Sequence, residues 1–432
     1  MWARLRGVKR VRSVAAWLGS KPVAAVLAVW VVDSLICWMR VPPDMRGRLW
    51  AEDGLVFLRS WALDGSPGLF FQPYAGYLQF LPRAASSLIA LAPIQYWAVL
   101  TAAAASICVG AVGAVAFHCS RSLVTFWPAR IAVALVPALL PLAGVEPLGT
   151  LCNLHSWALY AAFWLLFTQT RKRWVTVLLV VFTLAQALSE IQIVFFAVLA
   201  AWFVWRSKNL GQRLIGAAVI VGSLAQVVAY LSMGRAPYSD QVPSLGNVIQ
   251  GMLISVFGGT LTSSAALMTA VATYFGYRAM TVLALVSLVP VVLVLWRADG
   301  VHRLAVVYGG LLVVGIWFFS AYLLKFPGGV PLVPWRWGMG PAMLLLSLWI
   351  IAIDHFVRRR RLDASIAVFL LATLFIVQCV SFTMNNPRRQ GNQSWSEFVV
   401  AAKVECAGGA TQEPGPGFPA DWSWMVPCEL LR

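Results

Sequence analysis

Charged residues are scarce in this chain of 432 residues, where Asp, Glu, Lys and Arg together make up only 11%. A soluble domain carries about 25% charged residues, and a chain with so few cannot cover a water-facing surface. Hydrophobic residues account for 60% of the sequence, and the mean hydropathy is +0.78. The composition therefore excludes an ordinary soluble enzyme and predicts a protein whose bulk faces lipid.

Acidic residues are the rarer of the two charged kinds, 16 against 33 Lys and Arg, which leaves a net charge of +17. Such an excess can indicate nucleic-acid binding, but here the basic residues stand in short clusters between apolar runs. That placement is typical of membrane proteins, whose cytoplasmic loops collect Lys and Arg. We therefore expect membrane lipid, and no nucleic acid, as a partner of this chain.

Apolar runs long enough to cross a bilayer core, roughly 17–25 residues, recur along the chain. They predict an all-α polytopic membrane protein with about eleven transmembrane helices. The first run follows a basic arm and has no small-residue cleavage site after it, so we expect a retained helix rather than a signal peptide. The expected spans are residues 22–39, 94–119, 129–144, 153–169, 174–189, 191–205, 213–231, 279–296, 304–323, 338–356 and 363–383.

The basic clusters also predict an orientation. Runs such as Arg171–Arg173 and Arg358–Arg361 fall on short loops that alternate with longer loops richer in acids. Because cytoplasmic loops carry the excess of Lys and Arg, the N-terminus is expected in the cytoplasm and the C-terminus outside. The sequence thus predicts a multi-pass protein of an inner (plasma) membrane.

Three regions on the outer side are too long for simple turns: residues 40–93, residues 232–278 and the tail, residues 384–432. We divide the chain into a transmembrane module, residues 1–383, and this extracytoplasmic tail. Long loops tend to carry function, so we expect the working site on the outer face. The tail holds Cys406 and Cys428, which an oxidising compartment would join in a disulfide; two free thiols are the alternative.

The first outer loop contains an adjacent pair of acids just after the first span. The stretch reads Trp50-Ala51-Glu52-Asp53-Gly54 and precedes an apolar run from Leu55 to Leu63. Asp53 in front of that run is well placed to cap a helix. Adjacent residues point in different directions on a helix, so one acid can cap while the other faces a cavity.

This arrangement resembles the GT-C glycosyltransferases, multi-span enzymes that take a sugar from a polyprenyl-phosphate carrier. The resemblance rests on residues 50–54, on the later stretch Pro73-Tyr74 with Gly76-Tyr77-Leu78, and on the large first outer loop. It departs from some members in having no large soluble C-terminal domain. What it implies is an acidic general base in the first loop, and we expect Asp53 in that role first and Glu52 second. Tyr74, in the same stretch, is expected to contact substrate.

Basic residues of the outer face are candidates for the phosphate of the donor, because a lipid phosphate leaving group needs positive charge or hydrogen-bond donors. Arg336 is the first choice, since a guanidinium can bind a phosphate bidentately. An anchor in the aromatic belt is the alternative for Arg336, and snorkelling is the alternative for Lys325. The other candidates are Arg83 and Arg235.

Two further acids stand close to apolar segments, where ionisable groups are costly and indicate function. Glu146 lies in a short outer turn, and His155 follows it. Glu190 lies between two apolar runs. Each is expected to bind substrate hydroxyls or to take part in metal binding, and a hydrogen bond between helices is the alternative.

The predicted function is transfer of a sugar from a polyprenyl-phosphate donor to an envelope glycan or lipid acceptor on the outer face, with inversion at the anomeric carbon. The alternatives are a transporter or flippase for lipid-linked sugars and a non-catalytic protein of envelope assembly. No internal repeat of the kind that many transporters show is evident. The sequence shows no metal-type Cys and His spacing, and it indicates no cofactor; a divalent cation stays open as an option.

Overall fold

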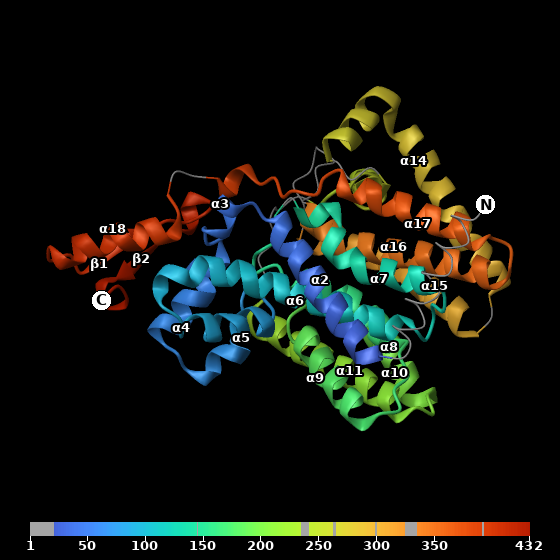
Figure 1. Cartoon of the computed structure of the whole chain (residues 1–432), viewed down its shortest axis with the longest axis horizontal. Helices are drawn as coiled ribbons and strands as arrows, with labels where there is room; N and C mark the ends of the chain where they lie inside the picture. The colour runs from blue at the N-terminus through green and yellow to red at the C-terminus, as the bar shows by residue number, and fades with distance from the viewer. Residues whose placement is uncertain are drawn as a thin grey trace, which may run out of the picture.

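The computed structural model describes residues 21–144, 146–234, 242–261, 265–298, 300–324, 335–390 and 393–432. The structure is 76% helix and 3% strand, in agreement with the all-α prediction. Figure 1 shows a body of packed helices from which the C-terminal tail extends at one end.

Seven helical segments are long and apolar enough to span a membrane. This confirms a multi-pass architecture, but seven such segments do not establish the predicted number of about eleven. Two of them include a short 3₁₀ turn, η3 (Ile94–Tyr96) before α6 and η4 (Pro141–Gly144) after α7. The helices are α2 (Pro22–Arg40), α6 (Trp97–Ser120), α7 (Trp127–Leu139), α11 (Leu210–Met233), α14 (Ala265–Arg297), α15 (Gly300–Leu324) and α16 (Trp335–Arg358).

The four remaining predicted spans fall on shorter helices. The apolar helices at three of them have 10–17 residues, and the fourth, α8, has 12. A crossing helix needs about 20 residues, so length alone does not make these helices spans. They are α8 (His155–Leu166), α9 (Arg173–Ala187), η5 (Ile191–Phe196) with α10 (Ala197–Arg206), and α17 (Ala364–Cys379).

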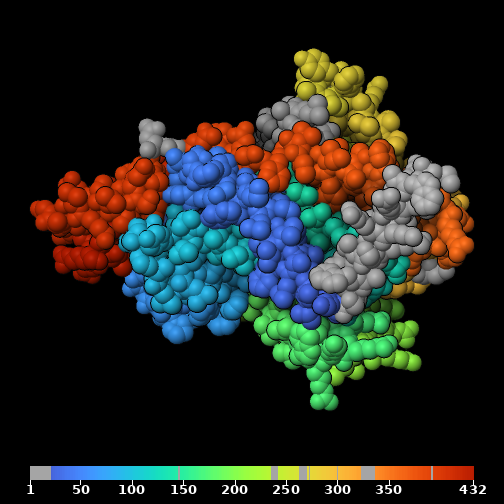
Figure 2. All heavy atoms as spheres, viewed as in Figure 1, coloured from blue at the N-terminus to red at the C-terminus, as the bar shows by residue number. Residues whose placement is uncertain are grey.

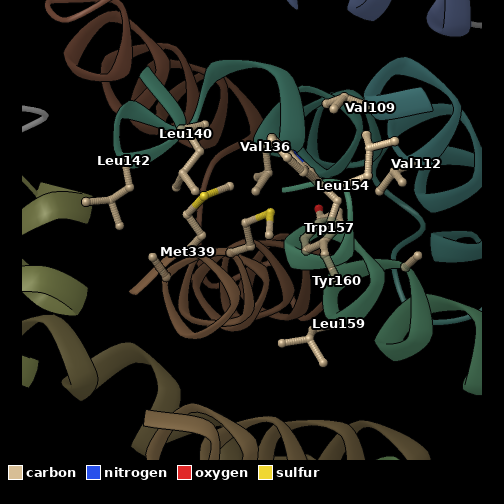
Figure 3. Packing of buried hydrophobic residues seen from close by; sticks show 14 of the residues in the cluster. Val109, Val112, Val136, Leu140, Leu142, Leu154, Trp157, Leu159, Tyr160 and Met339 are labelled. Carbon is tan, nitrogen blue, oxygen red and sulfur yellow. The ribbon is translucent and has the colours of Figure 1, made fainter. Parts of the chain in front are cut away.

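Helix α8 lies at the centre of the bundle. Every residue from Ser156 to Leu166 is buried, as expected for a helix that is hydrophobic on all sides. Figure 3 shows Trp157, Leu159 and Tyr160 of this helix packed among side chains of the neighbouring helices, with Met339 beside them. The structure surrounds this predicted span with protein on all sides.

Helix α7 contains Pro137 near its C-terminal end, and neighbouring side chains bind the carbonyl groups that the proline and the helix end leave free. A proline has no N–H to donate to the carbonyl four residues earlier, which is that of Val133. The hydroxyl of Tyr160 donates to Val133 O over 2.5 Å, and the indole of Trp157 donates to Pro137 O over 3.1 Å. Arg40 donates to the next free carbonyl, Ala138 O, at 2.6 Å. Because these carbonyl groups are hydrogen-bonded, the end of α7 can be buried.

Helix α2 packs tightly on α6 because α6 has glycines at the contact. A Cβ atom added at Gly110 would lie 2.2 Å from Ser34 Oγ, and one at Gly113 would lie 2.0 Å from Asp33 Oδ2. Small residues are a common device for close helix approach in membranes. The first span is thereby fixed, and with it the starting point of the loop that follows it.

The first loop, residues 40–93, is folded into short elements and lies beside the tail, as the adjoining blue and red parts of Figures 1 and 2 show. Residues 53–58 of this loop form a π-helical turn. This conformation is rare in proteins, and where it occurs it is often found at functional sites. The elements are α3 (Pro43–Arg46), η1 (Asp53–Leu58), α4 (Arg59–Leu63), η2 (Pro67–Phe71) and α5 (Phe80–Ile89).

The second long region, predicted at residues 232–278, is largely helical and packed. Its residues 253–258 are all buried, and the indole of Trp317 in α15 donates to Val248 O at 2.9 Å. The described elements are α12 (Leu245–Met252), η6 (Leu253–Gly258), α13 (Gly259–Leu261) and the start of α14.

The C-terminal tail forms a small unit of its own, with a two-stranded antiparallel sheet that pairs Gln412 with Pro427. The structure contains the predicted disulfide: Cys406 and Cys428 are bonded, with their Cα atoms 5.6 Å apart. The tail comprises η7 (Pro387–Arg389), α18 (Trp395–Ala407), β1 (Gln412–Gly415), η8 (Ala420–Trp422), β2 (Trp424–Pro427) and η9 (Cys428–Leu430).

Candidate functional site

A cavity of about 880 Å³ lies at one end of the helices. Its wall comes from five parts of the chain: the first loop, the segment before α8 with the first turns of that helix, the start of η5, the first turns of α16, and the tail. Polar and charged side chains converge there with aromatic ones, an arrangement typical of a ligand site.

The two adjacent acids of the first loop have different environments. Asp53 is completely buried, and its carboxylate accepts hydrogen bonds from Leu151 N at 3.1 Å and from Cys152 N at 2.8 Å. It does not line the cavity, and its side chain does not cap its own helix. Burial raises the pKa of Asp53 from 3.8 to about 7, although the bond from Cys152 N–H, the charge of Arg389 and the bond from Leu151 N–H lower it.

Glu52 lines the cavity. It is half-buried, and within the described part of the chain no hydrogen bond or ion pair is found for its carboxylate. The backbone turns just before it, because Ala51 has a φ of 40° and its N–H donates to Phe418 O at 2.7 Å. The geometry therefore reverses the expected order of the two acids: Glu52, and not Asp53, is placed to meet a substrate.

His155 and Glu190 form a hydrogen-bonded pair in the cavity wall. His155 Nδ1 lies 2.5 Å from Glu190 Oε2, and the other oxygen of Glu190 accepts from Gln192 N at 2.8 Å. The ring of Tyr77 meets the imidazole edge-on at a centroid distance of 5.8 Å. Two partners thus fix the orientation of the imidazole, and the structure brings together two residues that the sequence placed only separately.

Arg336 and Glu146 form a second pair, with Arg336 Nη1 2.8 Å from Glu146 Oε1. Both line the cavity. The sequence proposed each of them as a substrate contact without predicting that they meet. A guanidinium already held by a carboxylate has less of its charge available to an anionic ligand.

Tyr74 also lines the cavity, and a tight turn positions it. Tyr74 and Tyr77 exchange backbone hydrogen bonds of 2.9 and 3.2 Å around Ala75 and Gly76, which have φ values of 52° and 84°. Two successive positive φ angles are the signature of a type I′ turn. The Tyr-Ala-Gly-Tyr motif therefore builds a hairpin that presents aromatic rings to the cavity.

The other basic candidates are not in this wall. Arg83 is 2% exposed and does not line the cavity; its guanidinium lies 5.6 Å from the ring centroid of Phe57. Burial lowers the pKa of Arg83 to about 10. Arg235 and Lys325 lie outside the described residues.

The sequence analysis missed the contribution of the tail. Asn385, Asn386 and Arg388 line the cavity, and so do Pro419 and Trp422 from the later part of the tail. Within the described residues, no carboxylate pairs with the guanidinium of Arg388. This makes Arg388 a better cation for an anionic ligand than Arg336. Its position after the last apolar run was the only signal in the sequence, because no motif marks it.

Hydrogen bonds and stacked rings bring the tail to the site. Met384 N donates to Arg40 O at 2.7 Å, and Asn385 N donates to Gly144 O at 3.0 Å. Farther along, the ring of Trp395 stacks between those of Trp97 and Trp424, at centroid distances of 6.3 and 6.5 Å. The tail is therefore docked against both the first loop and the bundle.

In the part of the chain that the structure describes, no group of three or more His, Cys, Asp and Glu side chains is arranged to hold a metal ion.

Comparison with protein-family models finds no match, and no curated protein matches the sequence. The fold and the cavity define the class of protein: a multi-pass helical membrane protein with a polar site at one end of its helices.

Proposed function

We propose that this protein is a membrane glycosyltransferase of the GT-C type, which moves a sugar from a polyprenyl-phosphate donor to a glycan or lipid acceptor. The observation that carries the proposal is one cavity lined by both Glu52 and Arg388 at the end of a membrane-spanning bundle, where neither side chain has an oppositely charged partner among the described residues. Sugar transfer from a lipid phosphate needs both kinds of group, in one place, next to lipid.

Glu52 is assigned as the general base. It takes the proton from the acceptor hydroxyl while the hydroxyl oxygen bonds to the anomeric carbon and the bond from that carbon to the phosphate oxygen breaks. The electron pair of the broken bond stays on the phosphate, whose charge Arg388 stabilises by charge-assisted hydrogen bonds. Attack from the face opposite the leaving group inverts the configuration.

The rest of the wall suits a sugar. Trp50 and Trp422 offer apolar faces, and Asn153, Asn385 and Asn386 offer amides that can both donate and accept. The imidazole that Glu190 orients, and the paired Glu146 and Arg336, add polar groups in fixed positions. Fixed groups lose little conformational entropy on binding, which favours recognition of a polar ligand.

The positions of the helix ends support an outer location for the cavity. Helix α9 begins at Arg173 and ends near Glu190 of the cavity, whereas α16 begins beside the cavity and ends at Arg358. The basic ends are therefore opposite the cavity, and the positive-inside rule assigns basic ends to the cytoplasm. We infer that the N-terminus is cytoplasmic, that the tail is extracytoplasmic and that the membrane is a bacterial inner membrane. With the shorter helices counted as spans, the total is about eleven.

The test is direct transfer by the purified protein in nanodiscs. A panel of radiolabelled polyprenyl-phosphate sugars is offered with candidate lipid and glycan acceptors, with EDTA or with added Mg²⁺ or Mn²⁺. We expect saturable binding of one donor and transfer of its sugar to an acceptor. Binding without transfer to any acceptor would point to transport, and no binding at all would overturn the proposal.

The orientation has its own test. A cysteine at Thr411 in the tail should react with a membrane-impermeant maleimide in intact cells, and one at Lys208 should react only after lysis. Both side chains are exposed, so access to the reagent depends on the side of the membrane. The opposite pattern would place the cavity on the cytoplasmic face.

A further inference from the structure

The segment of residues 148–152 is held on both sides by side chains from distant parts of the chain. On its N–H side, Asp53 of the first loop accepts from Leu151 N and Cys152 N, at 3.1 and 2.8 Å. On its carbonyl side, Arg389 of the tail donates to Leu148 O at 3.2 Å and to Gly149 O at 3.1 Å. Both of these charged residues are completely buried.

This segment connects η4 to α8, and the residues on either side of it face the cavity. Glu146 precedes the segment, and Asn153 and His155 follow it. Nothing in the segment is regular secondary structure that would fix its shape. Its backbone conformation is therefore set by the groups that bind its N–H and carbonyl groups.

The packing leaves the segment little room to shift. Gly149 has a φ of 67°, a conformation that favours glycine, and a Cβ atom there would lie 3.0 Å from Val41. Leu148 and Leu151 are fully buried. A buried backbone N–H that lost its acceptor would have no water to replace it.

We propose that Asp53 and Arg389 are positioning residues: together they hold residues 148–152 in the shape that presents Glu146, Asn153 and His155 to the substrate. The two acids of the first loop then act in different ways: Glu52 contacts the substrate, and Asp53 acts through residues 148–152. The C-terminal tail becomes part of the catalytic machinery through Arg389. The clamp itself is a structural claim, and only its effect on catalysis rests on the proposed function.

Electrostatics support a coupled pair. Burial lowers the pKa of Arg389 to about 10, while the charge of Asp53 opposes that effect. The charge of Arg389 in turn lowers the pKa of Asp53. Each charge makes the other less costly to bury, as expected for two ionised groups bound to one stretch of backbone.

Hydrogen exchange of the full-length protein in nanodiscs tests the clamp without any activity assay. We expect Asp53→Asn to speed exchange of the Leu151 or the Cys152 amide at least tenfold, because each carboxylate oxygen accepts one of these N–H groups and the NH2 group that replaces one oxygen cannot accept. Arg389→Gln should speed exchange in the same segment, and Arg389→Lys should do so less. Asp64→Asn and Arg59→Gln, the same changes at exposed positions of the first loop, should leave this segment at the wild-type rate.

Wild-type exchange at residues 148–152 in Asp53→Asn would overturn the clamp. Loss of protection throughout α8 and α16 in both the Asp53→Asn and Arg389→Gln variants would also overturn it, because the two residues would then serve folding in general.

Kinetics then test the catalytic consequence. Misplaced groups in the wall should lower kcat more than they raise the KM for the donor. Because both residues act on one segment, the double variant Asp53→Asn with Arg389→Gln should lose no more activity than the worse single variant; additive losses would reject a shared role. If the wild type transfers no sugar, the proposed function fails, whereas the exchange experiment still decides whether the clamp exists.

Discussion

The first loop and the C-terminal tail each contribute two adjacent residues of like charge, and the structure divides both pairs in the same way. In the loop, Glu52 faces the cavity while Asp53 is buried against residues 151 and 152. In the tail, Arg388 faces the cavity while Arg389 is buried against residues 148 and 149. In each pair, one residue is placed for contact with a ligand and its neighbour for holding the wall.

The comparison shows that the acidic pair is easier to recognise in the sequence than the basic pair. Acids are rare in this chain, so a pair of them directly after the first span stands out. Arginines are common, and a pair of them in a tail has many ordinary explanations. The two pairs are nevertheless equivalent in the folded protein, and the following predictions test that equivalence.

The largest effect is expected at Glu52. Glu52→Gln keeps the shape of the side chain but removes the proton acceptor, so turnover should fall by roughly 10²–10⁴, the usual contribution of general base catalysis. Donor binding should remain, because the phosphate is held elsewhere. The assay is sugar transfer with the donor bound at saturation, and Glu405→Gln, an exposed glutamate of α18, is the control. A rate for Glu52→Gln close to that of the wild type would remove Glu52 from the mechanism.

The second largest effect is expected at Arg388, and it should appear in the affinity for the donor. Charge-assisted hydrogen bonds contribute about 1.5–3 kcal/mol, so Arg388→Gln should weaken donor binding by about 10- to 100-fold. Arg336→Gln should weaken it less, because Glu146 already occupies that guanidinium. Equilibrium binding of the labelled donor compares the two, with Arg59→Gln as the control. If Arg336→Gln weakened donor binding more than Arg388→Gln, Arg336 would be the phosphate-binding residue, as the sequence suggested.

Asp53→Asn should cost less activity than Glu52→Gln, about tenfold at pH 8, in line with the loss of one buried hydrogen bond worth about 1–3 kcal/mol. Wild-type activity should fall as the pH drops below about 7, because protonated Asp53 can no longer accept from both Leu151 N–H and Cys152 N–H. The variant should lack this change near pH 7. The ionised groups around Asp53 are Arg389, which favours its charge, and Glu52, which opposes it.

The free energy of unfolding should change with pH in the opposite direction to the activity. The pKa of Asp53 is about 7 in the folded protein and 3.8 ordinarily, so the folded state binds the proton more tightly than the unfolded state. The contribution of Asp53 to the free energy of unfolding is then fully present below pH 3.8 and is lost as the pH rises through 7. Thermal unfolding of wild type and Asp53→Asn across this range measures the difference. Parallel pH profiles for the two proteins, in both activity and stability, would contradict the assignment.

The smallest effect on activity is expected from the disulfide of the tail. Opening the Cys406–Cys428 bond, which closes a loop with a sequence separation of 22, should destabilise the tail by roughly 3 kcal/mol in the chain-entropy model. Activity should fall less than in the variants of Glu52, Arg388 and Asp53, because Arg388 and Arg389 lie before the loop that the disulfide closes. Limited proteolysis and transfer assays of Cys406→Ser with Cys428→Ser measure both, and Cys379→Ser is the control. A loss as large as that of Glu52→Gln would show that the disulfide unit itself is needed for catalysis.

The sequence alone predicted the class of protein and the approximate places of its helices, because hydropathy is summed over whole segments and tolerates local error. It also indicated the acid pair of the first loop and the two cysteines of the tail. The sequence did not reveal that α8 lies at the centre of the bundle, since an apolar run facing lipid and one buried among other helices have the same composition.

Only the tertiary structure decided which of two adjacent charges meets the cavity. The direction of Glu52 depends on the backbone turn at Ala51, and the burial of Asp53 depends on N–H groups about a hundred positions later in the chain. Arg388 and Arg389 acquire their roles because the tail folds back across the ends of α2 and η4. The membrane class follows from local composition, whereas the site requires contacts between segments that no local pattern relates to one another.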